Sequence, residues 1–140
     1  TGISKFDTDV LFSTADAELS SDARKALDEL AELLQSPDAR QLKIMVVGHA
    51  DDRGIAKKPT RERFPTNWHL STHRALTVTQ YLQESGVAAE RMGVSGFGAH
   101  QPIASNRSDA ERHLNRRVEI FVLGPGTPVV GRVDTTTTVY

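Results

Sequence analysis

Two charged residues near the middle of the chain, Asp51 and Arg74, are the first candidates for ligand chemistry. Asp51 follows a short apolar run that predicts a buried strand, and open α/β sheets bind ligands where their strands end. Arg74 falls on the apolar face of a predicted helix at 67–85, one turn after Leu70 and one turn before Val78. Burying a positive charge on this apolar face costs free energy unless the charge is paired. The pattern indicates either a structural role, as an ion pair or a side chain extended to the helix edge, or a guanidinium that binds a ligand carboxylate.

Histidines around the same segment raise the question of catalysis. His69 and His73 are four residues apart, so they share a helix face, and His49 and Asp51 precede them. The glutamate that zinc hydrolases carry beside the first histidine is absent, so we predict no metal site. Ser71 and His73 are two apart and point about 200° away from each other on a helix. We therefore predict no catalytic residues and no cofactor.

The elements that position these residues follow from periodicity and capping. Alternation of apolar and polar residues predicts strands. Apolar residues at helical spacing predict helices, with a serine cap before the first helix and Ser85-Gly86 at the end of the long one. The predicted strands are 10–12, 41–47, 92–98 and 117–123. The predicted helices are one that is capped by Ser20 or Ser21 and stopped by Pro37, one at 67–85 and a short one at 108–114. This order predicts an α/β fold: an α+β two-layer sandwich of βαβαβ type, with a mixed sheet and helices on one face.

Composition limits the function classes. The chain has 140 residues, a net charge of −1 and no cysteine, so nucleic acid is not an expected partner and disulfides are excluded. No apolar run is long enough to span a bilayer, so we expect no direct membrane contact from this fragment. We divide it into a polar N-terminal arm at 1–9, one domain at 10–123 and a C-terminal extension at 124–140. Because it begins at Thr1, we expect a fragment or processed form of a longer protein.

Several residues beside the candidate site have a structural and a functional interpretation. The basic segment 55–66 is expected to be a solvated loop, with steering of anionic glycan as the alternative. Trp68 is expected to be a core or staple residue first and a sugar-stacking surface second. Arg117 is expected on the solvent face of the last strand, and His49 is expected to pack or hydrogen-bond at the strand end.

A set of short motifs resembles one protein family. The motifs, in order, are Gly48-His49-Ala50-Asp51, Leu70-Ser71-Thr72-His73-Arg74-Ala75, Gly86-Val87, Arg91, Gly96-Phe97-Gly98, Pro102, Asn106 and Arg112-His113-Leu114-Asn115-Arg116-Arg117-Val118-Glu119-Ile120. They cover roughly residues 11–122, and the chain resembles the OmpA C-terminal-like peptidoglycan-binding domains. The segment 63–68 before the helix is similar to the flagellar stator (MotB-like) branch. Two positions depart from the family pattern: Ser13 stands where an aspartate is common, and Ala50 where a threonine is common.

The resemblance implies a non-covalent binding module for peptidoglycan. It implies that Asp51 binds the ammonium and Arg74 the carboxylate of a diaminopimelate residue in the stem peptide. It also implies that Asn67 contacts the same residue. Further positions near the site are implied to be Leu70, Ser71, Arg112 and Arg116.

The same resemblance implies a periplasmic anchor of a larger, membrane-tethered envelope protein in a diderm bacterium. The parent could be a stator protein, an outer-membrane porin or a lipoprotein, and a homodimer is left open. Two other function classes also remain open at this point. One is a metal-dependent peptidoglycan hydrolase, and the other is a structural dimerisation domain of a stator-like assembly.

Overall fold

The computed structural model describes residues 2–7, 11–12, 18–55 and 58–124. Its described strands are β1 (Gly2–Asp7), β2 (Lys43–His49), β3 (Met92–Gly96) and β4 (Arg117–Leu123). Its described α-helices are α2 (Ser21–Gln35), α3 (Lys58–Arg63), α4 (Asn67–Glu84) and α5 (Asp109–Asn115). Short 3-10 helices lie at Pro37–Ala39 and Ala89–Arg91. None of the described helices is long and apolar enough to cross a membrane.

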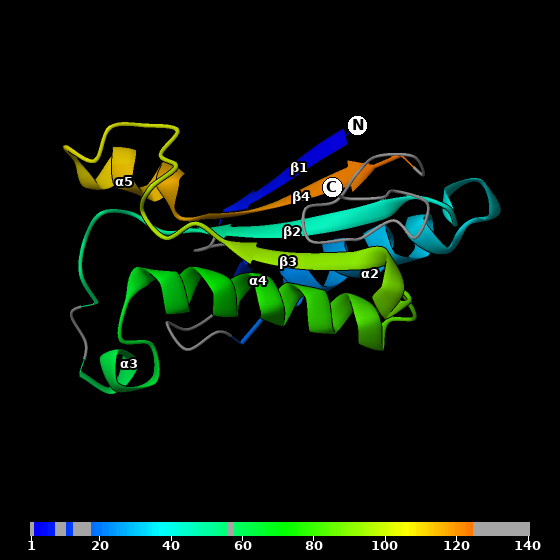
Figure 1. Cartoon of the computed structure of the whole chain (residues 1–140), viewed down its shortest axis with the longest axis horizontal. Coiled ribbons are helices and arrows are strands. Elements are labelled where there is room, and N and C mark those ends of the chain that lie inside the picture. The colour runs from blue at the N-terminus through cyan, green and yellow to red at the C-terminus, as the bar shows by residue number, and fades with distance from the viewer. Residues whose placement is uncertain (1, 8–10, 13–17, 56–57, 125–140) are drawn as a thin grey trace, which may run out of the picture.

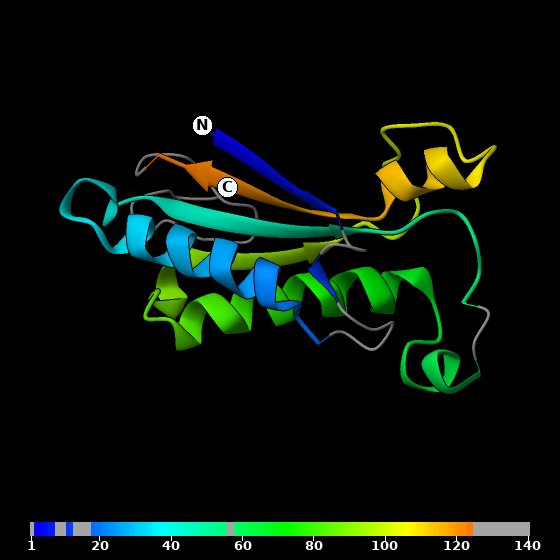
Figure 2. The ribbon, with the colours of Figure 1, turned by 180° about the vertical axis from the view of Figure 1, so that it is seen from behind.

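The described strands form one mixed sheet in the order β1-β4-β2-β3. β2 and β3 are parallel and are joined through α4, whereas β4 is antiparallel to both β1 and β2. A helix that connects two parallel strands packs on a face of their sheet. Helices α2 and α4 lie side by side on the same face, as Figures 1 and 2 show from opposite sides. The predicted two-layer α/β fold with a mixed sheet is therefore confirmed.

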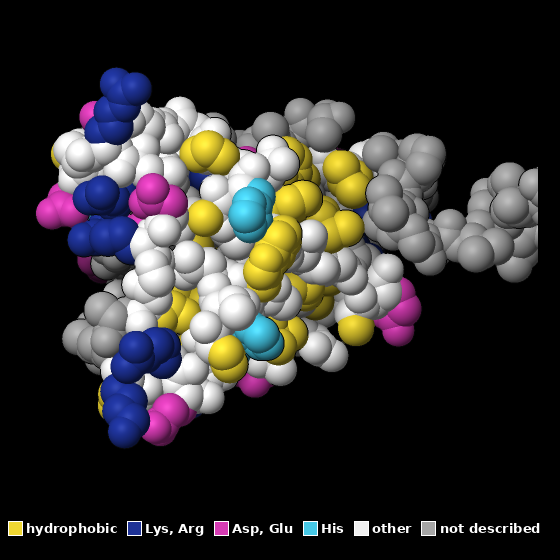
Figure 3. Space-filling view, turned by 60° about the vertical axis from the view of Figure 1, so that its left-hand side comes forward, with side chains coloured by type: hydrophobic (Ala, Val, Ile, Leu, Met, Phe, Trp, Pro, Cys, Tyr) yellow, Lys and Arg dark blue, Asp and Glu magenta, His cyan; other side chains and the backbone are white. Residues whose placement is uncertain are grey.

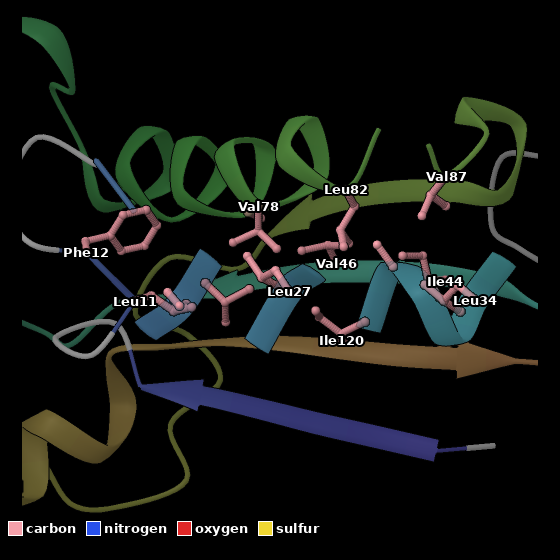
Figure 4. Close-up of a cluster of buried hydrophobic side chains, with 14 residues drawn as sticks. Leu11, Phe12, Leu27, Leu34, Ile44, Val46, Val78, Leu82, Val87 and Ile120 are labelled. Carbon is pink, nitrogen blue, oxygen red and sulfur yellow. The ribbon is translucent and has the colours of Figure 1, made fainter. Parts of the chain in front are cut away.

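The core lies between this helix pair and the sheet (Figure 4). Leu27 of α2, Val78 and Leu82 of α4, and Val46 and Ile120 of the sheet are all fully buried. These side chains follow helical spacing in the two helices and alternate positions in the strands. Burial of this apolar surface fixes α4 against β2 and β3.

Helix α4 has well-defined ends that match the prediction closely. The Thr66 hydroxyl accepts a hydrogen bond from the His69 N–H at 3.4 Å, which caps the first turn. At the other end Gly86 has a φ of 109°, and the Val87 N–H donates to the Leu82 carbonyl at 3.0 Å. The helix ends through a left-handed glycine, as the sequence predicts.

Close contact between the strand backbone and the backbone of α4 sets the distance of this helix from the sheet. A Cβ added to Gly48 at the end of β2 would overlap the backbone carbonyl oxygen of Ser71, and one added to Gly96 would overlap Thr72. The Ser71 hydroxyl also accepts a hydrogen bond from the Gly98 N–H at 3.0 Å. These contacts hold the first turns of α4 directly against the strand ends.

Two expectations about local structure are wrong. The N-terminal strand runs over Gly2–Asp7, inside the expected arm, and not over residues 10–12. It pairs antiparallel with β4, while Phe12 forms only an isolated bridge with Leu19. Leu11 and Phe12 are nevertheless buried in the core. The sheet therefore begins before the boundary that we predicted at residue 10.

The segment 55–66 is not simply a loop, because Lys58–Arg63 forms α3. Pro59 lies at the start of this helix, where a missing N–H costs nothing. Thr60 and Phe64 are buried, and the Phe64 ring lies 4.5 Å from the His73 ring, measured between centroids. These contacts attach the segment to α4. The predicted extension at 124–140 lies outside the described residues beyond Gly124.

Candidate functional site

The candidate site lies at the end of the sheet where β2 and β3 finish and α4 begins. The chain leaves β2 through Ala50, whose N–H donates to the Gly98 carbonyl at 2.8 Å, while the Phe97 N–H donates to the Gly48 carbonyl at 3.0 Å. These two bonds keep the segments that follow β2 and β3 together. Asp51 is the next residue along the chain.

Asp51 is the most enclosed carboxylate of the site, with 7% of its surface exposed. Its Oδ1 accepts the Arg53 backbone N–H at 2.9 Å. Its Oδ2 accepts Nη1 of Arg116 at 2.7 Å, and the Arg53 Nε lies 3.8 Å away. A buried carboxylate needs such partners. Both oxygens are therefore engaged within the chain, and Arg116 is the nearest cation.

Asn67 attaches the Asp51 loop to the first turn of α4. Its Nδ2 donates to the Asp51 carbonyl at 3.2 Å and to the Arg53 carbonyl at 2.9 Å. Both bonds go to backbone oxygens, so they fix the path of the loop. The structure therefore brings Asn67 and Asp51 together, with the Asn67 amide nitrogen bonded to backbone carbonyl oxygens.

Leu70 and Ser71 lie beneath the site surface. Leu70 is buried, and Ser71 is fully buried, with its hydroxyl donating to the Trp68 carbonyl at 3.3 Å. The same hydroxyl oxygen accepts the Gly98 N–H. Ser71 thus joins α4 to the segment after β3.

Arg74 is half-buried, one turn after Leu70 on the same helix. Its guanidinium carbon lies 5.9 Å from the centroid of the Phe12 ring, in cation–π range. The predicted position on the buried side of α4 is therefore confirmed. The aromatic contact orients the guanidinium beside the segment around Phe12.

Arg112 belongs to a group of charged side chains near Asp51. Its Nε lies 3.4 Å from Asp52 Oδ1 and its Nη1 lies 3.1 Å from Asp109 Oδ1. The Arg53 Nη1 approaches the same Asp109 oxygen at 3.2 Å. Arg53 was not among the predicted site residues. Its position two residues after Asp51 was the available signal, since an aspartate side chain commonly accepts the N–H two residues later.

A second buried charged cluster lies at the start of β4, and it corrects one expectation. Arg117 is buried and not solvent-facing, with its Nε 2.6 Å from Glu119 Oε1. Its Nη1 and Nη2 donate to the carbonyls of Asn115 and Gln101. Glu119 is two residues later in the same strand, on the same face, which was the signal that sequence reasoning missed.

His49 completes this cluster. Its Nε2 lies 3.0 Å from Glu119 Oε1, and its ring stacks on Phe97 at 5.6 Å. The expectation that His49 packs and hydrogen-bonds at the strand end is confirmed. Burial, together with the Arg117 charge, lowers the pKa of His49 from 6.5 to about 4, although Glu119 opposes this shift. His49 is therefore neutral near pH 7.

The other histidines are engaged separately. His69 Nδ1 lies 2.7 Å from the Thr66 hydroxyl, while the His73 ring packs on Phe64. Burial lowers the pKa of His73, and the charges of Arg63 and Arg74 act in the same direction. Within the described part of the chain, no three His, Asp or Glu side chains are grouped so as to hold a metal ion.

Trp68 departs from its first interpretation as a core residue. Half of its surface is exposed, and its ring stacks on that of His100 at 4.8 Å with 26° between the planes. The indole also packs against Gly98. Trp68 therefore lies on the surface beside the candidate site.

Comparison with known proteins gives a consistent assignment. A model of the OmpA family matches residues 11–116. Outer membrane protein A of Bordetella avium is 34% identical over 119 residues, which are 85% of this chain and 56% of that protein. The chain spans about half the length of the curated relatives it matches.

Solved structures agree with the fold and with the sequence match. The periplasmic domain of Helicobacter pylori MotB has a TM-score of 0.74 at 31% identity, covering 87% of this chain and 75% of that one. The cell wall anchor of the T6SS from Pseudomonas aeruginosa has a TM-score of 0.72 at 32% identity, covering 87% and 80%.

Proposed function

This chain belongs to the OmpA family, and from that premise we propose that it binds peptidoglycan non-covalently through the diaminopimelate residue of the stem peptide. The observation that carries the proposal is the Asp51 carboxylate, buried at the end of β2 with its Oδ2 already bound to a cationic group. A site that holds a guanidinium nitrogen at 2.7 Å has the charge and the hydrogen-bonding geometry to hold an ammonium group.

In this proposal the ligand's ammonium group takes the place of Arg116 on Asp51 Oδ2. Arg74 supplies the opposite charge and binds the ligand carboxylate from α4. Its contact with Phe12 reduces the freedom of the long side chain before the ligand arrives. A zwitterionic amino-acid end thereby meets one anion and one cation on two adjoining elements.

The remaining predicted site residues support these two. Asn67 fixes the loop that carries Asp51, and Ser71 fixes the helix that carries Arg74. Leu70 packs below them. Arg112 pairs with Asp52 and Asp109 at the rim of the site, and Arg116 becomes available to other ligand groups once it leaves Asp51.

We also propose that this domain anchors a larger envelope protein to the cell wall in the periplasm. The similarity to the periplasmic domain of MotB and to a structure described as a cell wall anchor supports this role. The part of the parent protein that is tethered to a membrane would then lie outside this chain.

The test compares Asp51→Asn and Arg74→Leu with the wild type in sedimentation with insoluble peptidoglycan and in calorimetry with free diaminopimelate. Each variant removes a charge-assisted contact that contributes about 1.5–3 kcal/mol, so both should lose detectable binding of free diaminopimelate and should bind insoluble peptidoglycan more weakly than the wild type. Arg74→Leu suits the apolar face of α4 and should remain folded with near-normal stability. Undiminished binding by a folded Arg74→Leu variant would contradict its role as the carboxylate partner.

A further inference from the structure

A group of aromatic and apolar side chains is exposed beside the candidate site. Trp68 is 50% exposed and Phe97 39%. Figure 3 shows one face of the molecule, on which apolar side chains gather around histidines next to the end where Lys, Arg, Asp and Glu side chains collect. Single exposed apolar residues are ordinary, but a contiguous group of them marks a binding surface.

The rings of this group are held rigidly. Trp68 stacks on His100, and its indole packs over Gly98, whose φ of 59° lies in the left-handed region that favours glycine. Phe97 stacks on the buried His49 ring with only 11° between the planes. The His100 N–H donates to the Phe97 carbonyl at 3.3 Å, which closes the turn that carries both rings. The surface is therefore formed before any ligand binds.

The chemistry of this surface suits a pyranose sugar. One face of such a sugar is lined with C–H groups and stacks on flat aromatic rings, while its hydroxyl groups need polar partners at the rim. The Trp68 indole N–H, the His100 ring nitrogens and the exposed Gln101 amide offer those partners. An apolar face with a few polar groups around it is the usual composition of a small-ligand site.

Neighbouring residues connect this surface to Asp51. Trp68 directly follows Asn67, whose amide holds the Asp51 loop, and the Gly98 carbonyl accepts the Ala50 N–H. A polymer that carries both a zwitterionic peptide and a sugar chain could therefore meet both surfaces at this end of the fold.

We propose that Trp68 and His100 form a stacking site for an N-acetylated sugar of the glycan strand, separate from the Asp51 and Arg74 pair. This inference rests on the proposed function, because the choice of sugar follows from peptidoglycan as the polymer. Trp68 and His100 thereby add a glycan contact to a domain whose other contact is with the peptide.

Trp68 is the only tryptophan in the chain, so intrinsic fluorescence reports directly on this site. The wild-type protein is titrated with peptide-free glycan strands and, separately, with free diaminopimelate. The glycan should shift and quench the emission with saturation, because stacking removes the indole from water. Absence of any response to the glycan at millimolar sugar would overturn the proposal.

Variants separate stacking from other causes of binding. Calorimetry with the same glycan strands should show about a tenfold loss of affinity for Trp68→Ala, a smaller loss for His100→Ala and little loss for Trp68→Tyr. Leu33→Ser is the matched control, since Leu33 is exposed on the distant helix α2 and should change nothing. Unchanged glycan affinity in Trp68→Ala would contradict the proposal.

Diaminopimelate binding distinguishes the two proposals. All four variants should bind diaminopimelate as the wild type does, which also shows that they fold. If the wild type binds glycan through Trp68 but not diaminopimelate, the peptide proposal fails and the sugar site stands. If instead Trp68→Ala abolishes self-association measured by sedimentation and leaves glycan binding unchanged, the surface is a protein contact and the sugar proposal fails.

Discussion

At the scale of single residues, the state of Asp51 before ligand binding is the main feature. Arg116 occupies its Oδ2 at 2.7 Å, so a ligand ammonium must compete with an internal cation. The Arg53 N–H on Oδ1 can stay in place during this exchange, because it approaches the other oxygen. The affinity of the site is thus a difference between two charge-assisted contacts, and not the strength of one.

We predict that Arg116→Ala tightens binding of free diaminopimelate by up to about tenfold, because it removes the competing cation. Calorimetry with diaminopimelate measures the change. Arg107→Ala is the control, since Arg107 is exposed and its loss changes the net charge equally. Weaker binding by Arg116→Ala would mean that Arg116 contacts the ligand itself.

His49 gives a prediction about stability against pH. Its pKa is about 4 in the folded protein and 6.5 when exposed, so between these values the unfolded chain binds the extra proton and the folded one does not. Neutral His49 therefore contributes to the free energy of unfolding in full above pH 6.5. This contribution, on the order of 3 kcal/mol, is lost as pH falls towards 4. Urea unfolding of wild type and His49→Gln across this range measures it.

The two stability curves should converge as pH falls, because glutamine keeps a donor for Glu119 but does not titrate. The remaining four histidines are common to both proteins and cancel in the difference. Parallel curves from pH 4 to 6.5 would show that His49 is already protonated in the folded state.

The sequence was informative at this scale wherever chemistry followed from local spacing. Arg74 could be placed on the buried side of a helix because Leu70 and Val78 lie one turn away on either side. The Arg116 contact with Asp51 joins residues 65 positions apart, and no local pattern encodes it. Arg117 was misplaced because alternation along a strand does not show when a charge is buried with its partner.

At the scale of elements, close packing of α4 on the strand ends positions the site. We predict that Gly48→Ala destabilises the fold by about 3 kcal/mol, because the new Cβ would overlap the Ser71 backbone carbonyl, which cannot turn away as a side chain can. Gly54→Ala is the control, as no atom lies within 4 Å of its added Cβ. Urea unfolding of both variants measures the difference.

Equal stability of the Gly48 and Gly54 variants would show that α4 can move away from β2 at little cost. In that case diaminopimelate binding should also survive in Gly48→Ala. Loss of binding together with stability is the expected result, since Asn67 on α4 holds the Asp51 loop.

Element prediction succeeded where caps and periodicity agreed and failed for short segments. Helix α4 and strand β4 match their predicted ranges within one residue, because apolar periodicity with the Ser85-Gly86 stop defines the helix and a β-branched alternation defines the strand. Strand β1 was missed because Gly2–Asp7 contains only two large apolar residues and lies at the edge of the sheet that the described strands form. Helix α3 was missed because six residues show less than two turns of periodicity.

At the scale of the whole molecule, the proposed peptide and sugar sites lie at one end of the fold. Two weak contacts with the same polymer combine, because the first one raises the effective concentration of the second. An anchor gains from this arrangement, since each contact alone can exchange while the domain stays attached. The rest of the sheet and α2 then serve as the rigid support that keeps the two sites in register.

The final prediction concerns the domain boundary that we place after Leu123. The buried core is composed of residues between Leu11 and Ile120, with Val122 packed against it, so a chain truncated after Gly124 keeps all of these contacts. The removed segment has a Pro-Gly-Thr-Pro run and four consecutive threonines, which offer little apolar surface for docking. The melting temperature of the truncated protein should stay within about 3 °C of the full chain, because a shift of that size corresponds to about 1 kcal/mol or less in a domain of this length. Calorimetric melting checks this, and diaminopimelate binding should persist in the same sample. A lower melting temperature with broadened unfolding would show that the C-terminal extension packs as part of the domain and that the boundary lies further along the chain.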